Sequence, residues 1–206
     1  MNKLASSHQL PEGSGLDTSR LLSFSDGVIA VIITILVLEF KVPSGYELHD
    51  LQPLLPAVLV YLLSFRQIAT YWANHHHLLR LAHHASNRLI WANLNLLFTI
   101  SLVPFATAWL GEHYNRPWPV ALYGFIALAV AVAYNILQRT VLAEYPSTLV
   151  EHTRFRRDIK GKLSLLAYVA GVGLAFVNVW ISIGLYVAVA IAWLVPERRV
   201  EDIATD

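Results

Sequence analysis

The side chains best able to bind a metal or carry a proton are histidines, and five of the nine lie close together in the sequence. His75, His76 and His77 are consecutive, so on a helix they point about 100° apart and cannot converge on one ion. His76 and His83, or His77 and His84, lie two helical turns apart, too far to chelate a metal without other ligands. The His-Glu-x-x-His pattern of zinc enzymes does not occur in the chain. We therefore expect no metal site, and we interpret these imidazoles as the solvated end of a helix.

A carboxylate could join these histidines in a proton relay. Asp26 stands just ahead of an apolar run, and a fold that brought it beside His75 would place an acid and a base together. A proton leak channel or proton-coupled transporter that uses Asp26 and the histidines therefore remains open. An enzyme has no comparable support, because the chain has no glycine-rich phosphate loop, no nucleophile elbow and no cysteine. We expect no catalytic residues and no cofactor.

The composition is that of an integral membrane protein. Of the 206 residues 56% are hydrophobic and only 14% are charged, whereas a soluble domain usually carries about 25% charged residues. The net charge of +1 gives no reason to expect a nucleic-acid partner. We expect the lipid bilayer as a partner, and no small-molecule substrate.

The apolar runs predict an all-α fold, a polytopic membrane protein with six transmembrane helices. About 20 residues at ~1.5 Å per residue cross a hydrocarbon layer of ~30 Å, a length that the first run reaches together with its polar start in Arg20–Phe40. The last run is too long for one ordinary span and short for two, and Asn178 with nearby glycines offers a place to turn, so we expect two short helices there. The runs are Val28–Leu38, Leu54–Ala73, Leu89–Leu110 (with Pro104 inside it), Val120–Leu137 and Leu163–Val195.

The placement of Lys and Arg favours six helices with both termini in the cytoplasm. With the N-terminus inside, the outer side receives only Lys41 and Arg116. We expect residues 1–18 to be a flexible cytosolic tail, 19–196 the six-helix transmembrane domain and 197–206 a cytosolic C-terminal tail. The inner side receives Lys3, Arg20, Arg80, Arg88, Arg139, Arg154, Arg156, Arg157, Lys160 and Lys162, joined by Arg198 and Arg199 if the last run crosses twice.

The stretch Arg20–Phe40 begins with polar residues and continues as the first apolar helix. Its opening reads R-x-x-x-F-S-D, formed by Arg20, Phe24, Ser25 and Asp26. This string, followed by Gly27 and an apolar helix, resembles the first-helix signature of the transmembrane protein 175 family in its prokaryotic form. The resemblance implies a potassium channel, a homotetramer of six-helix subunits in which the first helix of each lines a central pore. It also implies an integral protein of the bacterial inner (plasma) membrane.

The resemblance extends to a set of polar and aromatic residues near the inner ends of the first three helices. Trp72 and His75 form W-x-x-H at the end of the second helix, and Leu94–Asn95–Leu96 and Val103–Pro104–Phe105 match the third. A buried carboxylate or imidazole is tolerated only with polar partners, so such residues should form one network. The residues that the resemblance assigns to it, as a packing network and not as ion ligands, are Arg20, Phe24, Ser25, Asp26, Trp72, His75 and Asn95.

If the resemblance holds, the pore-lining residues are Val31, Thr34, Ile35 and Leu38, which share one helical face. Four copies of one side chain around an axis make a ring of a single residue type. The T-V-G-Y-G sequence of carbonyl filters is absent from the chain. Selection would then depend on how easily an ion loses water between aliphatic rings, which favours potassium modestly over sodium, with gating by dewetting. The simpler interpretation is that these aliphatic residues pack against other helices in a membrane scaffold that conducts nothing.

Arg66 departs from the family's pattern, because it places a charge in the middle of the second helix. It could snorkel to the interface, pair with a carboxylate such as Glu39, or face water. The sequence does not choose among the three.

Overall fold

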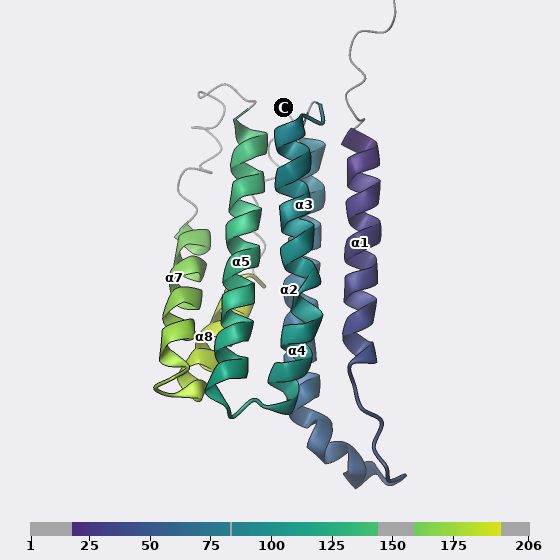
Figure 1. Ribbon diagram of the computed structural model, residues 1–206, viewed down its shortest axis with the longest axis vertical. Coiled ribbons are helices and arrows are strands. Elements are labelled where there is room, and N and C mark those ends of the chain that lie inside the picture. Colours follow the sequence, from purple (N-terminus) through teal and green to yellow (C-terminus); the bar gives the residue numbers. More distant parts are fainter. Residues whose placement is uncertain (1–17, 83, 144–158, 195–206) are drawn as a thin grey trace, which may run out of the picture.

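The computed structural model describes residues 18–82, 84–143 and 159–194, and all regular elements among them are helices (Figure 1). The segment from Asn87 to Glu112 forms one span made of two helices, since a turn at Leu102 separates them and Pro104 lies in the first turn of the second. The all-α expectation with six membrane helices is confirmed. The elements are α1 (Thr18–Leu38), η1 (Leu48–Leu54), α2 (Leu55–Arg80), α3 (Asn87–Ser101), α4 (Val103–Glu112), α5 (Pro117–Leu142), α7 (Ile159–Leu174) and α8 (Val179–Ala192). The expected tails, 1–18 and 197–206, lie outside the described residues except for Thr18.

Among the described residues, four spans are long and apolar enough to cross a membrane, and α8 is a shorter apolar helix. The spans are α1, η1 with α2, α3 with α4, and α5. α8 has 14 residues between its two caps, so it extends about 21 Å and does not match a ~30 Å hydrocarbon layer, and 16 residues of α7 are described. The expected turn near Asn178 is confirmed, because α7 ends at Leu174 and the Asn178 side chain caps α8 by accepting from the Trp180 N–H at 2.9 Å.

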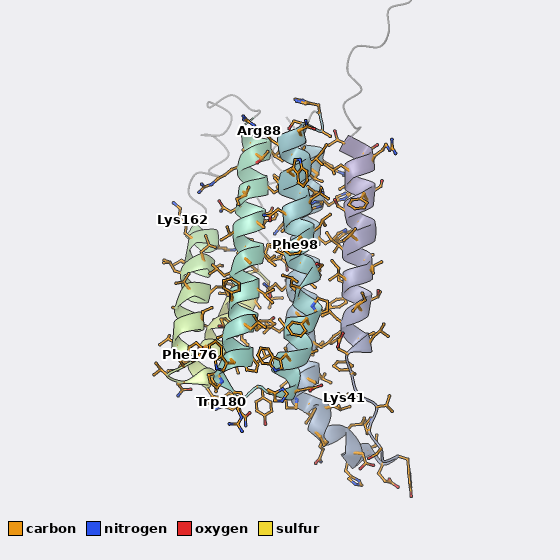
Figure 2. The ribbon with its side chains drawn as sticks, in the orientation of Figure 1. Lys41, Arg88, Phe98, Lys162, Phe176 and Trp180 are labelled. Carbon is orange, nitrogen blue, oxygen red and sulfur yellow. The ribbon has the colours of Figure 1, made fainter. Side chains whose placement is uncertain are left out.

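The helices form a bundle with α1 at one edge and α7 at the other (Figure 1). α1 packs on α2, α3 and α4, while α5 lies between α3 and the α7–α8 pair. Leu89, Leu96 and Ile100 of α3 are fully buried and lie at the spacing of one helical face. One end of the bundle, which we call the basic end, carries Arg88 (Figure 2) and the other cationic side chains where α1 and α3 begin and α2 and α5 end: Arg20, Arg80 and Arg139.

A buried chain of hydrogen bonds fastens α1 to α2 and α3 near the basic end. His75 Nε2 donates to Asn93 Oδ1 at 2.7 Å, and Asn93 Nδ2 donates to Ser25 Oγ at 2.8 Å. Ser25 Oγ in turn donates to the Leu21 carbonyl at 2.8 Å. His75, Asn93 and Ser25 are each 0% exposed, so water cannot replace these bonds. The chain fixes both the height and the rotation of α1 against its neighbours.

The asparagine in this chain is Asn93, which corrects the assignment of Asn95 to the packing network. The two residues lie at the same level of α3, but at about 100° per residue they point to nearly opposite sides. Asn93 shares the buried face with Leu89 and Leu96, whereas Asn95 is exposed.

Arg66 has a structural explanation that the sequence did not suggest. Its Nη2 donates at 3.3 Å to the carbonyl of Trp193, the C-cap residue of α8. The last carbonyls of α8 have no partner further along the helix, so they need donors or a cation. Arg66 supplies both, and no ion pair with Glu39 or another described carboxylate is present.

We expect Asn93→Ala to destabilise the protein and Asn95→Ala to have little effect on the protomer. The first change leaves the His75 N–H and the Ser25 oxygen without their buried partner, at a cost of about 1–3 kcal/mol. Thermal unfolding of the purified protein in detergent compares the same substitution at two positions of one helix. A larger loss of stability in Asn95→Ala than in Asn93→Ala would contradict the assignment.

Candidate functional site

α1 buries one face in its own protomer and leaves the other uncovered. The buried side chains are Leu21, Ser25, Ile29, Ile32 and Leu36, which recur every three or four residues. The opposite face exposes Val31 by 57%, Ile35 by 36% and Leu38 by 77%. All four residues expected to line a pore, Thr34 included, therefore lie on the side of α1 that no other described helix covers.

The uncovered face is smooth, aliphatic and interrupted by one hydroxyl. Near its basic end is Gly27, where a Cβ would meet no atom within 4 Å. Thr34 Oγ1 donates to the Val31 carbonyl at 2.8 Å, so its proton is occupied and its lone pairs are directed outward. Such a face can contact another helix, or it can border water that carries a cation past an oxygen atom. It offers no charged ligand to hold an ion tightly.

Asp26 lies beside the buried chain but makes separate contacts. Its Oδ1 accepts from Trp72 Nε1 at 2.9 Å, and its Oδ2 lies 4.0 Å from His76 Nδ1. These contacts hold the start of α1 to the last turns of α2. The structure thus brings together five residues of the R-x-x-x-F-S-D and W-x-x-H region: Ser25, Asp26, Trp72, His75 and His76.

Three residues assigned to the same network do not join it within the described protomer. Phe24 is 54% exposed, and Arg20 and Asn95 are also exposed. Phe24 lies on the same uncovered face as Val31, seven residues earlier in α1. Asn93, the residue that replaces Asn95, could have been found from its spacing with Leu89, Leu96 and Ile100.

The histidines that the structure describes do not assemble a metal centre. Among residues 18–82, 84–143 and 159–194, no three His, Cys, Asp or Glu side chains gather as a possible ion site. His76 and His77 meet edge to face with ring centroids 6.0 Å apart, a contact and not a chelate.

Comparisons with known proteins agree on one family. The profile described as "Endosomal/lysosomal potassium channel TMEM175" matches residues 20–104. A protein named potassium channel from Chryseobacterium is 44% identical over 186 residues, which cover 88% of this chain and 95% of that one. The crystal structure of a lysosomal potassium-selective channel TMEM175 homolog from Chamaesiphon minutus has a TM-score of 0.76 at 31% identity and covers 86% of this chain and 96% of that one.

A human relative, named endosomal/lysosomal proton channel TMEM175, is more distant. It is 24% identical over 131 residues, covering 61% of this chain and 26% of the human protein. The bacterial relatives match over nearly their whole length, and the profile match ends at Pro104, so the first three spans carry the family's sequence signature. The chain is an integral membrane protein that belongs to the TMEM175 family of ion channels.

Proposed function

We propose that this protein is a potassium channel whose ion path is lined by α1 from four copies of the chain, with modest selectivity over sodium. The observation that carries the proposal is the uncovered face of α1, with Val31, Ile35 and Leu38 exposed at successive turns. Bacterial relatives that match over most of the chain are named potassium channels, which supports the choice of ion. The pore, the tetramer and the selectivity are parts of this proposal.

The uncovered face suits a symmetric assembly. A C4 arrangement of α1 turns each exposed side chain into a ring, so Val31, Ile35 and Leu38 become three aliphatic constrictions and Thr34 a ring of hydroxyls. An ion that passes these rings loses part of its water and receives little in return. Potassium dehydrates at lower cost than sodium, so the rings favour potassium without a carbonyl cage, and a narrow aliphatic ring closes by dewetting.

The proposed orientation places the basic end in the cytoplasm. Arg20, Arg88 and Arg139 are exposed there. At the opposite end Lys41 pairs with Glu112 at 2.8 Å, which offsets its charge. By the positive-inside rule, α1 then begins on the cytoplasmic side of a bacterial plasma membrane. The tails before and after the 19–196 channel domain would then be cytoplasmic as well.

The alternative, a proton pathway through Asp26 and the histidines, has one observation in its favour: Asp26 and His76 lie 4.0 Å apart. The contacts of His75 argue against a relay in series. His75 bonds to Asn93 and through it to Ser25, and neither of these titrates near neutral pH. Asp26 bonds instead to Trp72, and no hydrogen bond between described residues links this pair to the His75–Asn93–Ser25 chain of hydrogen bonds. We therefore place these residues in the packing that supports α1.

The absence of cysteine allows a clean test of the assembly. A single Leu38→Cys variant should be linked into covalent dimers by a short bifunctional thiol reagent, because four copies of Leu38 would face one axis. Leu166→Cys on α7 is the matched control, because Leu166 is 66% exposed but lies on the far edge of the bundle. Linked Leu166→Cys with unlinked Leu38→Cys would place α1 at the periphery and refute the arrangement.

Adding one methylene to Val31 should change the potassium conductance through the first aliphatic ring. Val31→Ile should lower the single-channel potassium conductance, because four added methylenes narrow the ring and hinder water. Val169→Ile on α7 is the control, since Val169 is 56% and Val31 57% exposed in the protomer. Planar-bilayer recordings of both variants make the comparison. Equal conductance in Val31→Ile and the unmodified protein would remove Val31 from the ion path.

A further inference from the structure

A cavity of about 60 Å³ lies between α2, α5, α7 and α8, remote from α1. It occupies the part of the bundle where α8 ends short of the basic end, and its walls come from the inward faces of α2 and α5. The volume would hold several water molecules or one phosphate group. Its polar lining includes Arg66, Thr70, Asn74, Asn135 and Gln138, beside the indole of Trp193.

The cavity contains a positive charge that the described residues do not neutralise. Of the five N–H donors of Arg66, one meets the Trp193 carbonyl, while Nε is buried and has no partner. Among the residues that the structure describes, no Asp or Glu lines the cavity. A guanidinium within the bilayer is costly unless an anion or water compensates it. The site therefore has an unmet requirement for negative charge.

The walls provide further donors and an apolar floor. The side-chain amides of Asn74, Asn135 and Gln138 line the cavity and form no hydrogen bond within the described part of the chain. Between them lie apolar surfaces of Leu165 and Val189. Donors around one cation suit the oxygens of a phosphate, and the apolar surfaces suit the acyl chains attached to it. Together they describe a site for an anionic amphiphile.

The short helix α8 would bring lipid headgroups within reach of Arg66. A bilayer thins beside a helix of about 21 Å, so phosphates would lie deeper there than beside the 26-residue α5. Lys162, exposed at the start of α7, lies nearer the middle of the bundle than Arg88 does (Figure 2). A headgroup that follows α7 inward would pass Lys162 before it meets the cavity.

We propose that this cavity binds the phosphate of an anionic phospholipid from the leaflet at the basic end, with Arg66 as its principal cation. The phosphate of the bound lipid would accept hydrogen bonds from the Arg66 donors that the Trp193 carbonyl leaves unused. The lipid would thereby hold α8 against α2. The proposal does not depend on ion conduction, because the cavity is on the side of the protomer opposite to α1.

The test titrates the full-length purified protein in detergent with phosphatidylglycerol and measures lipid binding by native mass spectrometry and the accompanying rise in unfolding temperature. Phosphatidylcholine, whose headgroup has no net charge, and inorganic phosphate are titrated in parallel. We expect phosphatidylglycerol alone to bind and stabilise strongly. Equal stabilisation by phosphatidylcholine would overturn the proposal, and equal stabilisation by inorganic phosphate would replace the lipid by a soluble anion.

Variants separate this site from general surface attraction. Arg66→Gln should weaken phosphatidylglycerol binding at least about tenfold, because it removes a charge-assisted bond. Gln138→Leu, which keeps the Arg66–Trp193 bond, should weaken binding without lowering the lipid-free unfolding temperature, and it serves if Arg66→Gln fails to fold. Arg139→Gln at the exposed end of α5 is the matched control and should bind normally. If Arg139→Gln lost as much phosphatidylglycerol binding as Gln138→Leu, general surface charge would explain the binding and the proposed site would be contradicted.

Discussion

The structure depends on holding one helix by a single face. α1 buries Leu21, Ser25, Ile29, Ile32 and Leu36 in its own protomer, and the apolar members of this face gain no hydrophobic driving force against lipid, since acyl chains are as apolar as those side chains. The hydrogen-bonded chain from His75 through Asn93 to Ser25 supplies the directional contact that packing alone lacks. If it is broken, α1 can slide or rotate, and the face that carries Val31 and Leu38 no longer has a fixed direction.

The two halves of the bundle use polar groups for different purposes. Near α1 the polar side chains bond mainly to one another and set geometry, although His75 Nδ1 and His76 Nδ1 have no hydrogen-bond partner among the described residues. Near α8 the polar groups are left partly open, because Arg66 bonds to the carbonyl of the C-cap residue Trp193 while its Nε has no hydrogen-bond partner among the described residues. A channel subunit benefits from this division, because the rigid half positions the proposed ion path while the outer half contacts the bilayer.

Much of this organisation could be predicted from the sequence, because it depends on composition and periodicity. The six helices, the turn at Asn178 and the shared face of Val31 and Leu38 follow from apolar run lengths and the 3.6-residue repeat. The choice between Asn93 and Asn95 depends on how α3 is rotated about its own axis. Only the full pattern of buried leucines defines that rotation. Arg66 could not be explained, because its partner is the end of a helix 127 residues away, whose length the sequence leaves open. The tetramer is a property of several chains and remains a proposal.

The central claim, that the uncovered face of α1 is the wall of a potassium pathway, is tested most directly by reversal potentials of the purified protein in planar bilayers. Potassium on one side and sodium on the other, with and without a pH gradient, should give a potential set by potassium in the unmodified protein. Ile35→Asn, which places an amide in the proposed constriction, should shift that potential towards zero at unchanged folding, because a polar ring lowers the cost of sodium passage. A potential that follows the pH gradient and is lost in Asp26→Asn would contradict the account and favour the proton relay. Potassium selectivity left unchanged by Ile35→Asn would place the ion path somewhere other than α1.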